Sequence, residues 1–149
     1  MKNDLWCVLF LSTSKRDLTV EGVEQLLHSV RQERQSNDLT GLVIYARGNN
    51  LMGLIEGHKS NVISYYTLKL FHPIHHNVSK LYNGPIPYRF FENLPLAIKV
   101  IGNKQLMKFD DFKTINDKKK LKKFLEIEHP VPSAVNQFIK KSQTSRSLI

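Results

Sequence analysis

The alternation of apolar and polar residues predicts the secondary structure at the start of the chain. Residues 5–11 form an unbroken apolar run, which is typical of a central strand covered on both faces. After a polar loop, apolar residues recur at helical spacing from Val20 to Val30, and Thr19 is placed to cap this helix. Arg34 follows four residues after Val30 and so falls on the same apolar face, where an arginine is unusual.

The middle of the chain alternates between strand and helix patterns. Two apolar segments joined across Gly48-Asn49-Asn50 predict a hairpin. Gly53 stands inside the second of them, where a glycine leaves a gap in side-chain packing. Pro73 is expected to end the helix that follows. In chain order, the predicted segments are strands at 39–46 and 51–56, a helix at 60–71, and strands at 78–82 and 94–101.

This order, β-α-β-β-α-β-β, predicts an α+β protein with a ferredoxin-like sheet and two helices on one face. The other face stays bare unless the last third of the chain covers it. We expect helices at 109–115 and 118–127 to do so, and Pro130 and Pro132 to break the chain before a last helix near 134–140. The residues expected to pack inward are Phe112, Ile115, Leu121, Phe124 and Leu125.

The length of 149 residues fits one core, and we divide the chain into a sheet domain at 1–103, a helical extension at 104–141 and a disordered tail at 142–149. The formal net charge is +9, and most of the excess lies after residue 103. Cys7 is the only cysteine, so no internal disulfide forms, and its apolar surroundings indicate a buried thiol. No run is long enough to span a membrane and no signal-peptide pattern is present, so we expect a cytoplasmic protein.

A series of short motifs runs through residues 5–101. They are FLS at the end of the first strand, DLT before the first helix, and then LTGLVIY, LIEGHKSNV, HPIHHNV and GPIPYRFF. Each is common alone, but their joint order and spacing resemble the BLUF domains, blue-light sensors that hold FAD between the two helices of a ferredoxin-like sheet. The resemblance therefore implies the same fold that the apolar pattern predicts.

The resemblance also implies three photochemical side chains, and all three differ here. Carried over by motif, the family's tyrosine position is Phe10, its glutamine position is Gly53 and its asparagine position is Arg34. Phe10 has no hydroxyl proton, Gly53 has no amide to rearrange, and Arg34 offers five donors but no acceptor. We therefore expect the usual light reaction to be absent. FAD is the cofactor that the family implies, and these substitutions favour a protein without it.

Three interpretations of Arg34 are open. In the first, the side chain fills the space of the missing glutamine and flavin and donates to backbone carbonyls of the Gly53 strand. In the second, the guanidinium binds flavin or another anionic, planar ligand. In the third, it reaches from the end of the apolar stripe into solvent. We favour the first.

Other positions of the family's flavin pocket also carry over. His75 matches the family's histidine near the ribityl-phosphate side, whereas the acidic and basic positions beside it are His72 and Ile74. Arg31 is placed either to meet a phosphate or to serve as a solvated helix charge. Leu94 and Leu96 stand where the family has its mobile tryptophan or methionine, and we expect both to be ordinary core residues.

No catalytic or metal site is expected. The histidines of HPIHHNV lack a cysteine or carboxylate at a spacing that would complete a zinc site. Ser12 has no nucleophile motif around it, and Cys7 lies inside a strand. The lysine-rich run at 118–123 fits an amphipathic helix with its lysines outward, or a patch for nucleic acid.

These observations predict a degenerate BLUF-type domain that is regulatory and not an enzyme. The resemblance to the family implies that it acts by binding a partner protein or a second copy of itself, through the sheet or the C-terminal helices. One alternative is an FAD-binding blue-light photoreceptor with altered flavin contacts. A second alternative is a basic nucleic-acid-binding protein, and no membrane contact is expected.

Overall fold

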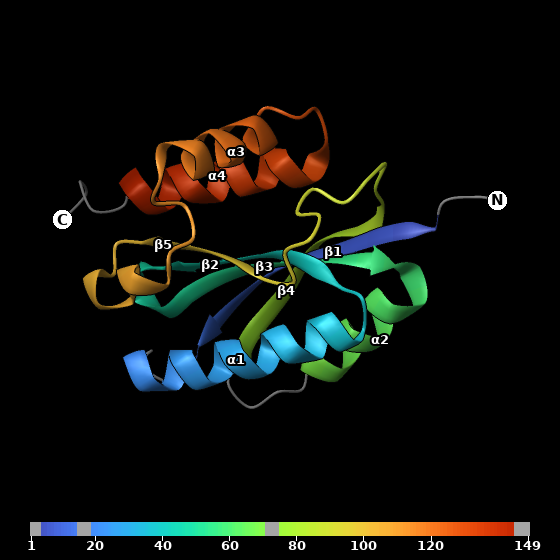
Figure 1. Ribbon diagram of the computed structural model, residues 1–149, viewed down its shortest axis with the longest axis horizontal. Coiled ribbons are helices and arrows are strands. Elements are labelled where there is room, and N and C mark those ends of the chain that lie inside the picture. Colours follow the sequence, from blue (N-terminus) through green and yellow to red (C-terminus); the bar gives the residue numbers. More distant parts are fainter. Residues whose placement is uncertain (1–3, 15–18, 71–74, 145–149) are drawn as a thin grey trace.

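The computed structural model describes residues 4–14, 19–70 and 75–144 (Figure 1). Its strands and helices, in chain order, are β1 Leu5–Ser14, α1 Val20–Ser36, β2 Thr40–Ala46, η1 Arg47–Asn49, β3 Asn50–His58, α2 Lys59–Leu70, β4 His75–Pro85, β5 Ala97–Ile101, η2 Lys104–Phe109, α3 Ile115–Leu125 and α4 Pro130–Thr144. Pro73, expected to end α2, lies outside the described residues.

The five strands form one sheet in the order β4-β1-β3-β2-β5. β5 runs parallel to β2, and the other neighbouring pairs are antiparallel. The predicted α+β ferredoxin-like sheet is therefore confirmed, with β4 and β5 at its edges. Within the described ranges, no helix combines the length and apolar character that crossing a membrane requires.

The sheet lies between two helical layers, with α1 and α2 on one face and α3 and α4 on the other (Figure 1). Side chains of the apolar run of β1 point alternately to the two faces of the sheet, so they contribute to the hydrophobic core on each face. Val8 and Phe10 pack with residues of α1 and α2, whereas Cys7 and Leu9 pack with residues of α3 and α4. The prediction that this strand is covered on both faces and that Cys7 is buried is confirmed.

The apolar stripe of α1 sets that helix on the sheet. The Thr19 hydroxyl accepts a hydrogen bond from the backbone N–H of Gly22 at 3.1 Å, so the predicted N-cap is confirmed. Val23, Leu27 and Arg34 are the buried residues of this helix. Because Arg34 lies on the buried face of α1, its side chain packs against the sheet together with the apolar side chains of that face.

The helix predicted over 109–115 is wrong. A 3-10 helix ends at Phe109, and Asp110 then turns the chain. The Asp110 carboxylate accepts the backbone N–H groups of Val100 at 2.8 Å and of Phe112 at 2.7 Å. Because these bonds fix the segment against β5, the apolar residues at helical spacing do not form a helix.

α3 and α4 cover the second face of the sheet as expected, but their ends differ from the prediction. Ile115, expected to pack inward, is the first residue of α3 and is 74% exposed, whereas Leu121 and Phe124 are buried. Pro130 and Pro132 lie in the first turn of α4 rather than before it. A proline is tolerated there because the first backbone N–H groups of a helix have no partner within it. The helix also continues past residue 141 to Thr144.

The outer edge of β5 is covered by two carboxylates from the segment that follows it. Asp111 accepts the backbone N–H of Ile98 and Asp110 accepts that of Val100, both at 2.8 Å. The backbone N–H of Asp111 donates in turn to the carbonyl of Ile98 at 2.8 Å. Side chains therefore satisfy edge groups that a further strand would otherwise pair with.

Candidate functional site

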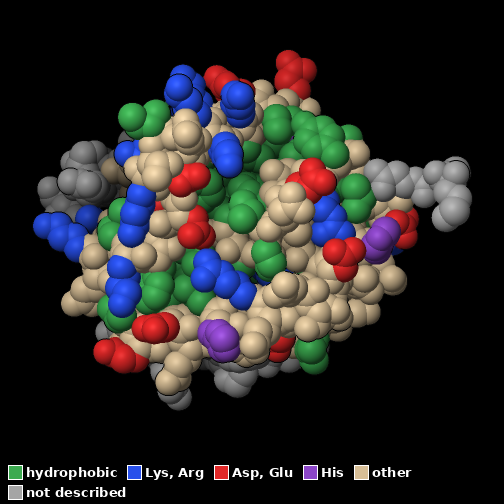
Figure 2. All heavy atoms as spheres, in the orientation of Figure 1, with side chains coloured by type: hydrophobic (Ala, Val, Ile, Leu, Met, Phe, Trp, Pro, Cys, Tyr) green, Lys and Arg blue, Asp and Glu red, His purple; other side chains and the backbone are tan. Residues whose placement is uncertain are grey.

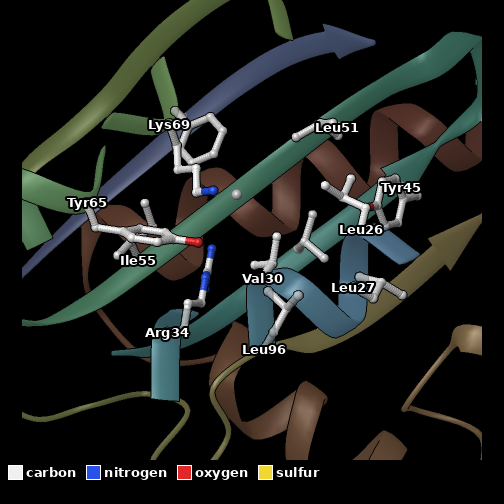
Figure 3. A pocket seen from close by; sticks show the side chains of 13 residues that line it. Leu26, Leu27, Val30, Arg34, Tyr45, Leu51, Ile55, Tyr65, Lys69 and Leu96 are labelled. Atoms are coloured by element: carbon white, nitrogen blue, oxygen red, sulfur yellow. The ribbon is translucent and has the colours of Figure 1, made fainter. Parts of the chain in front are cut away.

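A cavity of about 70 Å³ lies between α1, α2 and the sheet (Figure 3). Its walls combine three of the positions carried over by motif with apolar residues of the helices and strands. The lining residues are Phe10, Leu26, Leu27, Val30, Arg34, Val43, Tyr45, Leu51, Gly53, Ile55, Tyr65, Lys69 and Leu96. The structure thus brings Phe10, Arg34 and Gly53 together at one site.

The ring of Phe10 takes the space beside Gly53. The two residues face each other in the β1–β3 pairing. A Cβ atom placed on Gly53 would lie 2.4 Å from Cζ of Phe10, far closer than carbon atoms approach. Gly53 therefore has no side chain because the neighbouring strand's ring packs directly on its backbone. Such cover of a strand glycine by an aromatic ring from the adjacent strand compensates for the missing side chain.

Arg34 is buried, with 4% of its surface exposed. Its Nη1 donates to the carbonyl of Leu54 at 2.9 Å and, at 3.4 Å, to the carbonyl of Pro95. The guanidinium thus reaches the strand of Gly53, as the first interpretation predicted, and does not extend into solvent. Burial lowers the pKa of Arg34, but an arginine keeps its charge in proteins.

The close approach of Arg34 to β3 depends on Gly41. This glycine has a φ of +151°. A Cβ here would lie 2.0 Å from the carbonyl oxygen of Leu54 and 2.9 Å from Nη1 of Arg34. The glycine of the LTG motif therefore leaves the room in which the arginine meets its carbonyl acceptor.

Three further side chains stand at the Arg34 end of the cavity, and none was singled out from the sequence. The Tyr65 hydroxyl donates to Glu33 at 3.3 Å, and the Lys69 ammonium forms an ion pair with the same carboxylate oxygen at 2.6 Å. Burial raises the pKa of Tyr65 to about 12, so its hydroxyl stays protonated. Tyr65 and Lys69 are four residues apart on α2, which places them on one helix face, but only the packing of α1 against α2 shows what they approach.

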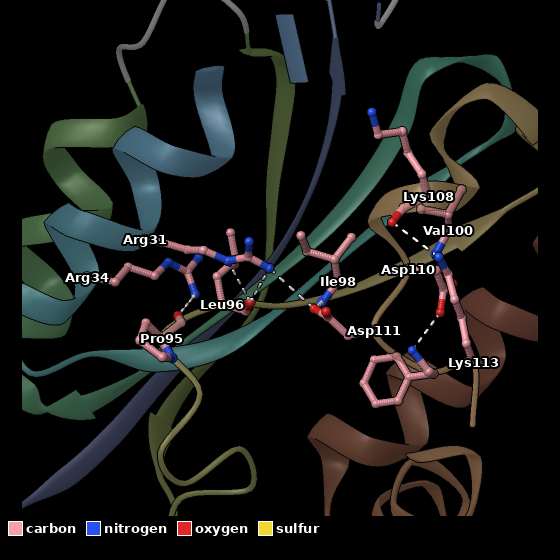
Figure 4. A network of polar contacts seen from close by, with 11 residues as sticks. Arg31, Arg34, Pro95, Leu96, Ile98, Val100, Lys108, Asp110, Asp111 and Lys113 are labelled. Carbon is pink, nitrogen blue, oxygen red and sulfur yellow. Dashed lines mark hydrogen bonds and ion pairs between the residues drawn. The ribbon is translucent and has the colours of Figure 1, made fainter. Parts of the chain in front are cut away.

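Arg31 is more than a solvated helix charge, because its side chain binds two groups of the protein, and its contact with a phosphate stays a prediction. Its Nη2 donates to the carbonyl of Leu96 at 3.3 Å and to Asp111 at 3.4 Å (Figure 4). Because Asp111 also holds the backbone of Ile98, the side chain links α1 to β5 and to the segment leading into the C-terminal helices. This ion pair is partly exposed, so it adds little stability and serves mainly to fix geometry.

The remaining family positions have mixed outcomes. Leu96 is buried and lines the cavity, as predicted, but Leu94 is 46% exposed and the prediction of a core residue is wrong. The chain passes Pro95 before β5 begins at Ala97, three residues later than expected. The backbone of His75 opens β4 opposite Ser14, and its side chain lies outside the described residues. His72 and Ile74 lie outside them as well.

Metal and nucleic-acid chemistry find limited support. Among the described residues, no three histidine, cysteine or acidic side chains form a group that could hold a metal ion. The lysines of the run at 118–123 are all exposed on α3, and Figure 2 shows Lys and Arg side chains gathered over that part of the surface. The outward placement of the lysines is confirmed, whereas contact with nucleic acid stays a prediction.

Glu56, from the LIEG motif, lies inside β3 rather than at its end, and its carboxylate joins several segments of the fold. It is fully buried and accepts the backbone N–H groups of Phe90 and Phe91 at 2.9 and 2.7 Å, and the hydroxyl of Thr40 at 2.9 Å. Burial raises the pKa of this carboxyl, and the hydrogen bonds it accepts oppose that shift. The carboxylate therefore ties the GPIPYRFF segment to β3 and β2.

We expect Glu56→Gln to lower the free energy of unfolding by about 2 kcal/mol, because the amide turns one acceptor into a donor and leaves a buried N–H without a partner. Urea unfolding of the two proteins measures the loss. Glu92→Gln is the control, since Glu92 is exposed in the same segment and should change stability by less than about 0.5 kcal/mol. Equal effects at the two positions would contradict the role assigned to Glu56.

The family model described as "Sensors of blue-light using FAD" (BLUF) matches residues 5–97. The chain belongs to the BLUF family. That match covers more than half of its length and includes Phe10, Arg34 and Gly53. A comparison with curated protein sequences finds no match.

Solved structures of similar fold include other BLUF proteins. BlrB in its dark state is 19% identical with a TM-score of 0.63, covering 88% of this chain and 97% of that one. BlrP1 from Klebsiella pneumoniae is 17% identical with a TM-score of 0.69, covering 91% of this chain and 33% of that one. A bacterial light-regulated adenylyl cyclase is 20% identical with a TM-score of 0.61, covering 97% and 35%. The chain therefore spans about a third of the length of the last two.

The residues of this BLUF domain do not fit the family's FAD. The cavity of about 70 Å³ is well below the volume of about 300 Å³ or more that small-molecule pockets have. The ring of Phe10 covers Gly53, and the guanidinium of Arg34 is bound to the β3 backbone where the family places a neutral amide. With Phe10 and Arg34 in these positions, the cavity is too small to hold a flavin ring.

Proposed function

We propose that this chain is a regulatory BLUF domain that acts by binding a partner protein or a second copy of itself, without flavin and without the family's light reaction. The observation that carries the proposal is the packing of Phe10 on Gly53. The first residue lacks the proton and the second lacks the amide that the family's switch uses, and together they close the space between them. A binding function needs a surface rather than a chromophore, so it survives these changes.

The proposed domain organisation follows the same reasoning. Residues 1–103 supply the sensory fold, and 104–141 form an extension whose helices take up one face of the sheet. The exposed lysines of α3 then favour a partner with an acidic surface, because opposite charges steer association and select partners. The proposal includes no enzymatic step.

The test is a visible absorption spectrum of the purified protein after incubation with FAD and desalting, recorded before and after blue illumination. We expect no retained flavin band, while free FAD passed through the same column controls for carry-over. A retained band without a light-induced red shift would contradict the flavin-free part of the proposal. A reversible red shift would overturn the proposal as a whole, because another residue would then supply the switch.

A further inference from the structure

Arg34 is a buried cation that forms no ion pair with the described residues. Nη1 is bound to the carbonyls of Leu54 and Pro95, and Nε, which is fully buried, has no hydrogen-bond acceptor. The buried carboxylate of Glu56 also acts on the charge of Arg34, but its oxygens accept hydrogen bonds from other segments and not from the guanidinium. Buried charges in proteins are normally bonded directly to an opposite charge. The guanidinium therefore lacks a hydrogen-bonded anion.

The neighbouring groups do not supply that anion. Glu33 does not line the cavity, and its carboxylate is bound to Lys69 at 2.6 Å and to the Tyr65 hydroxyl at 3.3 Å. The guanidinium carbon of Arg34 lies 5.9 Å from the Tyr65 ring centre, so the arginine packs beside this group. Among the residues that line the cavity, Arg34 and Lys69 are the cations and none is acidic.

The cavity has one polar end and one apolar end. Figure 3 shows Arg34, Tyr65 and Lys69 converging on one side, while Leu26, Leu27 and Tyr45 lie on the other. A volume of about 70 Å³ holds a few non-hydrogen atoms, since a cavity of about 150 Å³ accepts benzene. The shape and polarity suit a small molecule with a charged head and a short apolar tail.

We propose that this cavity binds a small monocarboxylate, with the carboxylate beside Arg34 and Lys69 and the aliphatic tail among the leucines of α1. A carboxylate accepts hydrogen bonds from guanidinium, ammonium and hydroxyl donors together, and the small volume limits the ligand to a few non-hydrogen atoms. This inference rests on the proposed function in one respect, because it requires the space between the helices to be free of flavin.

Sodium acetate is the probe, since its four non-hydrogen atoms suit the volume, and ethanol is the uncharged molecule of the same chain length. Calorimetric unfolding at constant ionic strength, held with sodium chloride, should show a melting temperature that rises with acetate concentration. The rise follows because a ligand that binds only the folded state stabilises it. We expect ethanol to give no such rise, since it has no charge to pair with Arg34.

Two variants locate the site. Lys69→Met, at a partly exposed position, should weaken acetate binding about tenfold or more, because it removes one charge-assisted contact. Val30→Phe should abolish the shift by filling the cavity, since Val30 lines it. Lys122→Met, on the exposed face of α3, removes the same charge far from the cavity and should leave the shift unchanged.

The proposal is overturned if acetate does not stabilise the wild-type protein, if ethanol stabilises it equally, or if Lys69→Met and Lys122→Met behave alike. These outcomes are separable from a failure of the proposed function. A flavin band after desalting would contradict the flavin-free function whatever the response to acetate. A colourless protein that acetate does not stabilise would overturn this inference alone.

Discussion

Replacing Gly41 with alanine is expected to lower the free energy of unfolding by more than about 4 kcal/mol, a loss that few single substitutions reach. The new Cβ would lie 2.0 Å from the carbonyl oxygen of Leu54, and the φ of +151° is one that alanine rarely adopts. The atom in the way is backbone inside the β2–β3 pairing, so it cannot swing aside. The same shift would break the hydrogen bond from Arg34 to Leu54.

The matched control for this prediction is Gly48→Ala. Gly48 also has a positive φ, of +77°, but a Cβ there meets nothing closer than 3.4 Å. Its cost should be about 1 kcal/mol, which is the backbone strain alone. Urea unfolding of both variants separates steric overlap from strain. Similar losses at the two positions would show that the close approach of β3 to Gly41 does not matter.

The second large effect is expected at Gly53, where restoring the family's glutamine should cost about 3 kcal/mol. The side chain overlaps the ring of Phe10, and overpacking of this kind costs about 1–3 kcal/mol. Because the ring of Phe10 is itself buried, it cannot move aside freely, which places the loss at the upper end of this range. Chemical denaturation of the purified variant measures the loss.

A double-mutant cycle shows whether the ring is the cause. Phe10→Ala alone should be destabilising by about 3 kcal/mol, because it leaves a cavity. Combined with Gly53→Gln, it should give a loss smaller than the sum by at least about 1 kcal/mol, since each change makes room for the other. Additive losses would mean that the two side chains do not compete for one space.

Much of the fold can be predicted from the spacing of apolar residues. The run of β1 and the stripe of α1 are long and regular, and both meet the expected faces of the sheet. The same stripe placed Arg34 on the buried face, so its contact with β3 could be anticipated. The spacing of apolar residues does not show that the outer edge of β5 has free backbone N–H groups. These groups bind Asp110 and Asp111, and the bonds prevent the helix expected after Phe109.

The sequence identifies which positions of the site are substituted, but it does not show which contacts those residues make. Phe10 and Gly53 were each identified by motif, yet only the strand register shows that one residue fills the gap left by the other. Tyr65 and Lys69 sit in an ordinary-looking helix, and their approach to Arg34 follows from how α1 and α2 pack. Partners brought together by tertiary packing leave no local signal in the sequence. The position of Pro130 and Pro132 inside α4 does not follow from the sequence for a different reason, because a proline can either end a helix or occupy its first turn.

The carboxylates along β5 also limit how copies of this protein can join. A sheet with two open edges can add neighbours without end, whereas one with a single open edge can pair only once. Asp110 and Asp111 occupy the outer groups of β5, which leaves β4 as the other edge of the described sheet. If copies of this domain pair strand to strand, they would therefore do so through β4, and such an assembly would stop at two copies.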